Sequence, residues 1–288
     1  MNQSQRTLKA MRFATVLAAI SQLLAAAVAE PPGETPNPQD PSSANSAPDV
    51  LVPASAQSPR DQAVAQRLVL SRIDGEICWI ESEGKNFLAL FRESHEALLH
   101  GGLIINISSG SIVDAQPLHR ELARSAAASG WAALSIQPAT TDPGSPGKLV
   151  PVVSNPRLDA AFEYLVARGI KNIVVAGDAS GAVEAIRYVI EKESAAISGF
   201  IGLGRWSAPL EGTDISILDI VGTRDQPAVA FKNIRREQLR RRKKRIEHLE
   251  IDGAGPVFYG YEQEIAKRVR GWLERATPGI ALLQRQHV

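Results

Sequence analysis

The sequence predicts an α/β fold: a mostly parallel sheet covered by helices on both faces and preceded by an antiparallel hairpin. From Gly75 onward, short apolar runs alternate with segments of helical periodicity, the order typical of β–α units. The apolar runs are continuous rather than alternating, as expected for strands buried on both faces. With 288 residues and 44% hydrophobic residues, the chain is long enough to bury a large core.

Residues 1–29 have the pattern of a signal peptide. Arg6, Lys9 and Arg12 precede an apolar run over 13–29 that ends in Ala-Val-Ala, an A-x-A cleavage pattern. A membrane anchor is the alternative, but this run is short and contains polar residues, so it is marginal for a span. The expectation is export through a cleaved signal peptide and a periplasmic location.

Residues 30–60 are expected to form a disordered linker. The stretch from Glu30 to Pro59 holds eight of the 18 prolines, among many Ser, Ala, Asn and Gln residues. Such a composition cannot bury enough apolar surface to fold. The predicted division is then a folded domain over 61–276 and a C-terminal tail over 277–288.

Within the domain, Gln62–Leu70 is expected to be a short helix. The first two strands are expected to pair as a hairpin around Gly84-Lys85, and later strands to alternate with helices. Asn155 and Pro156 mark one helix start, by side-chain capping and by proline in the first turn. The expected strands are Glu76–Glu81, Asn86–Arg92, Gly102–Ser108, Trp131–Gln137, Asn172–Ala176, Ala196–Leu203, Ile215–Val221 and Ile246–Ile251. The expected helices in this part are Pro117–Ser129, one beginning at Pro156, Val183–Glu193, Ala228–Lys244 and a closing helix that buries Ile265, Val269, Trp272 and Leu273.

The most specific motif is the strand–turn–helix segment NIVVAGDASGAVEAI. Its form matches a nucleophile elbow, G-x-S-x-G, in which strand and helix pass so closely that the flanking positions must be small. Gly177 and Gly181 occupy those positions, and Ala179 stands where the serine belongs. Ser180 is one position late, and a tight turn in another doubly wound fold is the competing interpretation.

From about Gly75 to Arg275, the chain resembles the α/β-hydrolase superfamily and, within it, the bacterial domain-of-unknown-function family 3530. The resemblance rests on the elbow at Gly177 and on the segments FLALF at 87–91, GWAALSI at 130–136 and RGWL at 270–273. It implies a catalytic order of serine, acid and histidine. On that pattern Asp225 matches the acid, Pro256 stands at the histidine position, and an oxyanion loop is formed by Ser108, Ser109 and Gly110.

This pattern predicts a degenerate triad and a pseudoenzyme that binds a small ligand or an envelope protein. Alanine cannot attack a substrate, and proline cannot accept a proton as general base. The alternative is an active, esterase-like serine hydrolase using Ser180, Asp225 and a displaced histidine, His248 or His119. Arg205 and Trp206 follow the strand after the elbow and are candidates for lining a vestigial pocket.

Other classes are disfavoured by composition. The formal net charge is +1, which argues against a nucleic-acid binder. Cys78 is the only cysteine, and the five histidines show no HExxH spacing, so neither a metal site nor a cofactor is expected.

A basic run between 235 and 245 is the second feature. Eight cations fall within these eleven residues: Arg235, Arg236, Arg240, Arg241, Arg242, Lys243, Lys244 and Arg245. On a helix they are expected to cover the outer surface, leaving Ile234 and Leu239 to pack. The run is interpreted either as a solvated helix or as a patch for an anionic partner. The latter gives a further alternative, an envelope-assembly or scaffold component.

Overall fold

The structure is a computed structural model that describes residues 58–139, 155–208, 210, 215–240 and 246–277, without the side chains of residues 239 and 240. The predicted signal peptide, the linker as far as residue 57 and the tail beyond Thr277 lie outside these residues. In the described part, no helix has the length and apolar character that crossing a membrane requires.

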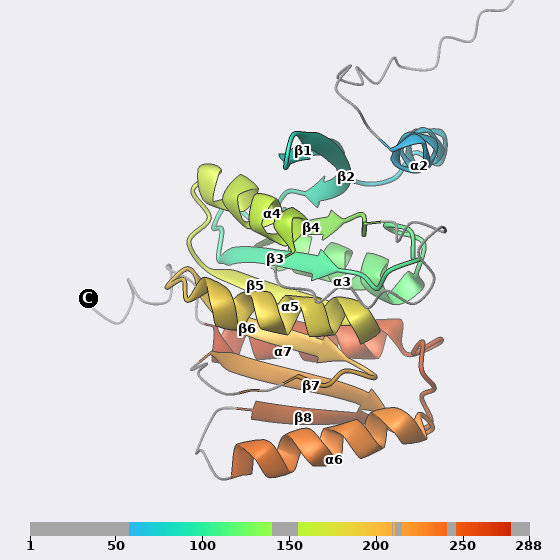
Figure 1. Ribbon diagram of the computed structural model, residues 1–288, viewed down its shortest axis with the longest axis vertical. Helices are drawn as coiled ribbons and strands as arrows, with labels where there is room; N and C mark the ends of the chain where they lie inside the picture. The colour runs from blue at the N-terminus through green and yellow to red at the C-terminus, as the bar shows by residue number, and fades with distance from the viewer. Residues whose placement is uncertain (1–57, 140–154, 209, 211–214, 241–245, 278–288) are drawn as a thin grey trace, which may run out of the picture. The chain divides into compact units, whose positions relative to one another are not determined.

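Eight strands form one sheet in the order β1-β2-β4-β3-β5-β6-β7-β8 (Figure 1). The antiparallel pair β1 and β2 is followed by β4, which pairs antiparallel with β2, and every later pair is parallel. The mostly parallel sheet predicted from the sequence is confirmed. The strands are β1 Glu76–Ser82, β2 Lys85–Arg92, β3 Gly101–Asn106, β4 Trp131–Ile136, β5 Ile173–Asp178, β6 Ile197–Leu203, β7 Ser216–Gly222 and β8 Ile246–Ile251.

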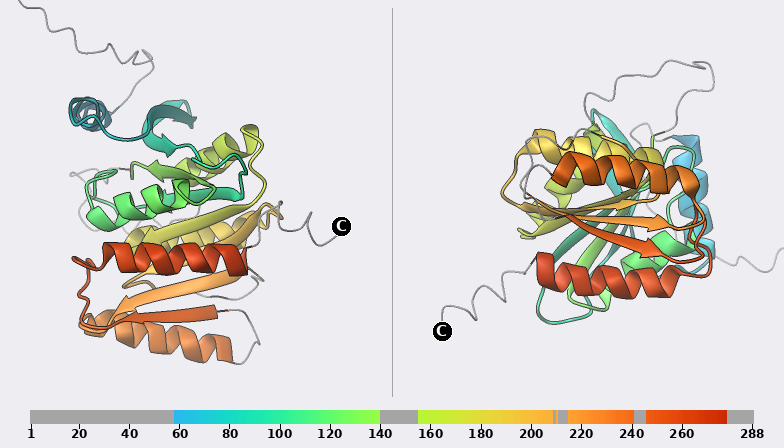
Figure 2. Two further views of the ribbon diagram at one scale, coloured as in Figure 1. Left: turned by 180° about the vertical axis from the view of Figure 1, so that it is seen from behind. Right: turned by 90° about the horizontal axis from the view of Figure 1, so that it is seen from below.

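Helices cover both faces of the sheet, as Figures 1 and 2 show. One face carries α3 and α7, with α2 packed into the same core cluster, and the opposite face carries α4, α5 and α6. The helices are α2 Pro59–Leu70, α3 Pro117–Ala127, α4 Pro156–Ala167, α5 Ala179–Lys192, α6 Gln226–Arg240 and α7 Glu262–Ala276. Because α2 begins at Pro59, the last two residues of the predicted linker belong to a helix.

The apolar strands supply side chains to two cores. On β3, Leu103 and Ile105 belong to the cluster with α3 and α7, whereas Ile104 belongs to the cluster with α4 and α5. All three are fully buried, which explains why this strand is apolar throughout instead of alternating.

Local signals fix the start of α4. The Asn155 side-chain oxygen accepts a hydrogen bond from the Leu158 backbone N–H at 3.1 Å, and Pro156 occupies the first turn. This satisfies one of the free N–H groups at the helix start, as the sequence predicts.

The basic helix is the main departure from expectation. Arg235, expected on the outer surface, is fully buried, and Ile234, expected to pack, is 49% exposed. Ala228, Lys232 and Arg235 recur at i, i+4 and i+7 and form the buried face of α6.

Buried Asp219 on β7 explains this orientation of the helix. The Arg235 guanidinium lies 2.6 Å from the Asp219 carboxylate and also stacks over the Trp206 ring. The buried polar contacts of Arg235 therefore determine which side of α6 faces the sheet, and a stripe of apolar side chains does not. The cations at 241–245 lie outside the described residues.

Candidate functional site

The elbow forms where β5 turns directly into α5. Ala179 is the first residue of α5 and has a φ of +43°, in the left-handed region that non-glycine residues rarely adopt. A nucleophile elbow holds its serine in a sharp, strained turn of this kind. The strained backbone is therefore present, and the side chain at its apex is a methyl group.

Close approach of strand and helix requires the two flanking glycines. A Cβ on Gly177 would lie 2.7 Å from the backbone of Ala182, and a Cβ on Gly181 would meet the carbonyl oxygen of Asn106. Both neighbours are backbone atoms and cannot move aside cheaply. The crowding inferred from the G-x-A-x-G spacing is thus present in the structure.

A cavity of about 270 Å³ lies above the elbow. It brings together three positions that the resemblance singled out, Ala179, Asp225 and Pro256, although they come from distant parts of the chain. Ser108 and Arg205 line it as well. Ser109, Gly110, Trp206, Ser180 and His248, which were also candidates, are not among its lining residues.

Asp225 is buried and already has partners. Its carboxylate accepts hydrogen bonds from the Arg205 Nε at 2.8 and 3.0 Å and from the Ala228 backbone N–H at 3.3 Å. The residue therefore anchors Arg205 and caps the start of α6. In this arrangement it orients an arginine, whereas a catalytic acid orients a histidine.

The loop after β3 directs its backbone donors at the elbow. The Ser108 N–H donates to the Asp178 Oδ1 at 2.7 Å, and the Ser109 N–H donates to the Ser180 Oγ at 3.2 Å. In acyl-transfer enzymes, donors of this kind must be free to bind the developing oxyanion. Here both are engaged by side chains of the chain itself.

Asp178 has a different role from the helix cap that its position suggests. It stands at the N-cap of α5, but its side chain makes no capping bond. Its carboxylate instead accepts from both the backbone N–H and the hydroxyl of Ser108. Sequence reasoning missed this contact, and its only signal was a carboxylate placed in a crowded turn.

His119 lies beside Asp178 in the cavity wall. Its Nε2 is 3.7 Å from the Asp178 Oδ2, which is beyond hydrogen-bond reach, and its Nδ1 has no partner within the described residues. Burial lowers the pKa of His119, and the nearby Asp178 carboxylate only partly opposes that effect. Burial thus favours the neutral form of the imidazole.

The alternative dyad of Ser180 and His248 is not brought together. Ser180 is exposed in the first turn of α5, where its hydroxyl accepts the bond from the Ser109 N–H. His248, on β8, places its Nδ1 3.0 Å from the Asp219 Oδ2. No hydrogen bond in the described part of the chain joins Ser180 to a histidine.

Trp206 belongs to the same buried network as His248. It is 1% exposed, and its Nε1 donates to the Asp219 Oδ1 at 3.1 Å. Of the predicted pair, only Arg205 therefore reaches the cavity. The described residues also contain no group of three or more His, Cys, Asp or Glu side chains placed to hold a metal ion.

Comparison with known sequences gives a family match that ends before the elbow. The family model described as a protein of unknown function (DUF3530) matches residues 8–156, which is more than half of the chain. No curated protein sequence matches the chain.

Solved structures that resemble the chain are α/β hydrolases. A dienelactone hydrolase from Anabaena variabilis has a TM-score of 0.60 at 18% identity, with 71% of this chain and 98% of that chain covered. An α/β serine hydrolase homologue from Coxiella burnetii has a TM-score of 0.56 at 16% identity, covering 70% and 98%. A lidless α/β serine hydrolase from Xanthomonas campestris has a TM-score of 0.54 at 13% identity, covering 72% and 96%. These similarities establish the α/β-hydrolase fold.

Proposed function

The chain belongs to the DUF3530 family of proteins of unknown function, and we propose that it is a non-catalytic α/β-hydrolase-fold protein that binds a small ligand in the cavity above Ala179. The α/β-hydrolase fold itself is established by the sheet order and the structural neighbours. The loss of catalysis and the binding role are the proposal.

The proposal rests on the apex of the elbow. Ala179 stands there, and the backbone donors of the neighbouring loop are hydrogen-bonded to side chains of the chain itself. A methyl group cannot form an acyl intermediate. The Ser108 and Ser109 N–H groups are bonded to Asp178 and Ser180, so no free pair of loop donors is available to an oxyanion. The cavity volume of about 270 Å³ nevertheless leaves room for a small ligand.

The competing function is an esterase that uses Ser180. It needs a base within hydrogen-bond reach of the hydroxyl. Ser180 instead accepts a bond from Ser109, and His248 lies on the Asp219 network. The proposed function therefore does not include the hydrolase activity named for the Anabaena protein.

Turnover of p-nitrophenyl acetate and p-nitrophenyl butyrate tests the loss of catalysis. We expect the purified chain and its Ser180→Ala variant to give the same rate, no higher than that of an equal concentration of heat-unfolded protein. A saturable rate in the wild type that is lost in Ser180→Ala would overturn the proposal and favour the esterase.

Blocking the cavity tests the binding role. Val257 lines the cavity and is 65% exposed, so Val257→Trp fills the cavity from its rim without disturbing the core. Tyr259→Trp, at a residue that is 80% exposed and outside the lining, is the matched control. Native mass spectrometry of protein purified from its host should show a small co-purifying ligand that Val257→Trp alone removes. Identical spectra for all three proteins would contradict the binding role.

We also propose that the mature protein acts outside the cytoplasm. The observation is the signal-like pattern over 1–29, and fractionation with N-terminal sequencing of the exported chain tests it. Cleavage after Ala29 is the expected result, and an uncleaved chain in the cytoplasmic fraction would refute it.

An anionic envelope partner at Arg240, Arg241, Arg242, Lys243 and Lys244 is likewise a proposal, based on the charge of that segment. Its test is a salt-sensitive pull-down from envelope extract. The retained material should be lost when these cations are replaced by glutamine.

A further inference from the structure

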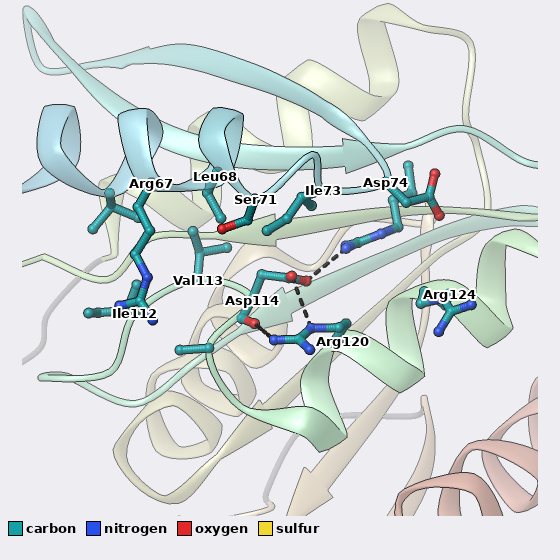
Figure 3. A pocket seen from close by; sticks show the side chains of 13 residues that line it. Arg67, Leu68, Ser71, Ile73, Asp74, Ile112, Val113, Asp114, Arg120 and Arg124 are labelled. Carbon is teal, nitrogen blue, oxygen red and sulfur yellow. Dashed lines mark hydrogen bonds and ion pairs between the residues drawn. The ribbon is translucent and has the colours of Figure 1, made fainter.

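A second cavity, of about 440 Å³, lies between α2, the end of β2 and the segment that leads into α3. It shares no lining residue with the cavity above Ala179. Figure 3 shows Arg67 on one side of Asp114 and Arg124 on the other, with Arg120 bonded to Asp114 between them. The cavity is thus lined by arginines that come from separate parts of the chain.

Arg92 is the buried arginine of this cavity. Its side chain is 2% exposed, and its Nη2 donates to the Asp114 Oδ1 at 2.7 Å. Its Nε and Nη1 are buried and have no hydrogen-bond partner within the described residues. Asp114 is therefore the one carboxylate that pairs with the buried Arg92 charge within the described residues.

The charge of the cavity lining is unbalanced toward positive. Asp114 is shared by Arg92 and Arg120, the latter through its Nε at 3.1 Å. Arg67 and Arg124 are exposed at the rim, and Arg124 also forms an ion pair of 3.8 Å with Glu121, which lies outside the lining. In all, four arginines face two aspartates: Arg67, Arg92, Arg120 and Arg124 against Asp74 and Asp114.

Part of the cavity wall is apolar. Val64 and Leu68 of α2 are buried and line the cavity, and Val113 lines it from the segment before α3. A ligand that fits must offer a compact apolar part to this wall and a negative head to the arginines. Bare inorganic anions satisfy only the second condition.

We propose that this cavity binds a small organic phosphate monoester, with its phosphoryl group on the arginines and its apolar part against α2. A phosphate monoester carries about two negative charges near neutral pH, and the four arginines of the lining outnumber its two aspartates. Guanidinium groups pair with phosphate oxygens through two parallel N–H bonds, and Arg67 and Arg124 are exposed at the rim of the cavity.

Calorimetric titration of the full chain with phenyl phosphate tests the proposal. Inorganic phosphate supplies the head alone and phenol the apolar part alone. We expect phenyl phosphate to bind at least about tenfold more tightly than inorganic phosphate and phenol not to bind, because both walls contribute. Equal affinities for phosphate and phenyl phosphate would assign the cavity to free phosphate and overturn the monoester assignment.

Two double variants distinguish binding in this cavity from nonspecific attraction of an anion to surface arginines. Arg67→Gln/Arg124→Gln removes two exposed rim arginines and should weaken phenyl phosphate binding about tenfold or more. Arg268→Gln/Arg270→Gln removes the same charge from exposed positions on α7 and should leave the affinity unchanged. Equal losses in both variants, or no binding by the folded wild type at millimolar concentration, would overturn the proposal.

Discussion

The two cavities differ in how their charged groups are used. Above Ala179, Asp225 is bonded to Arg205, and Asp178 is bonded to Ser108, so both carboxylates already have partners. In the arginine-lined cavity, the four arginines of the lining outnumber its two aspartates, and two N–H groups of buried Arg92 have no acceptor among the described residues. The first is built around the elbow motif, and the second is lined by arginines without a recognised motif.

A backbone motif and an available binding site are therefore separate properties of this molecule. The strained elbow at Ala179 persists although nothing at its apex can react. Binding capacity is indicated instead by groups whose hydrogen-bonding potential is unmet.

The largest effect is expected from Asp114→Asn. Asp114 neutralises the buried Arg92 side chain, and removing one partner of a buried ion pair costs about 3 kcal/mol or more in unfolding free energy. Urea denaturation should show this loss, and saturating phenyl phosphate should restore part of it by binding the folded state.

Asp74→Asn is the matched control for that substitution. Asp74 lines the same cavity but is exposed, so the change should stay within about 0.5 kcal/mol. Equal stabilities for the Asp114→Asn and Asp74→Asn variants would show that Arg92 does not depend on Asp114.

Gly177→Ala should be the next most costly change, at the other cavity. Its Cβ would lie 2.7 Å from the Ala182 backbone, and such overpacking costs about 1–3 kcal/mol. Gly255→Ala meets no atom within 4 Å and serves as the control for thermal and urea unfolding. A neutral Gly177→Ala would mean that the elbow is looser than its geometry implies.

His119 is expected to make the free energy of unfolding depend on pH. Burial lowers its pKa below the ordinary value of 6.5, so the folded state binds fewer protons than the unfolded chain just below that pH. The contribution of His119 to the free energy of unfolding has its full value above pH 6.5 and decreases as the pH falls toward the lowered pKa. The free energy changes by at most about 1.4 kcal/mol per pH unit in this range.

The variant His119→Gln should flatten this slope in urea denaturation between pH 4 and 7, roughly the range around the ordinary histidine pKa. His95→Gln, at an exposed histidine, should leave the wild-type slope intact. Unchanged slopes in both variants would place the pH dependence elsewhere.

The smallest effect is expected from Ala179→Gly. Glycine relieves the left-handed strain at φ +43° but gains freedom in the unfolded chain, so the net stabilisation should be no more than about 1 kcal/mol. A clear loss of stability in calorimetric unfolding would contradict the strain assigned to the elbow.

The fold was largely predictable because its signals are local. Continuous apolar runs, glycine spacing at the elbow and the Asn155-Pro156 helix start each depend on a few neighbouring residues. The positions of Ala179, Asp225 and Pro256 around one cavity followed from the motif order and its resemblance to a known superfamily.

Contacts between distant segments were not predictable in this way. Arg235 was expected on the surface because a basic run usually is solvated, yet Asp219, on another element, draws it into the core. The Asp178 bond to Ser108 and the unpaired groups of Arg92 likewise depend on chain segments far apart in sequence. Charge pattern alone does not reveal which cations have buried partners.

The central claim is that the elbow holds no activated serine. The most direct test is labelling of the purified, folded chain with a fluorophosphonate probe, measured by intact mass beside Ser180→Ala. We predict no added mass in either protein, because Ala179 replaces the nucleophile and Ser180 has no histidine bonded to it in the described structure. Stoichiometric labelling of the wild type that disappears in Ser180→Ala would contradict the claim.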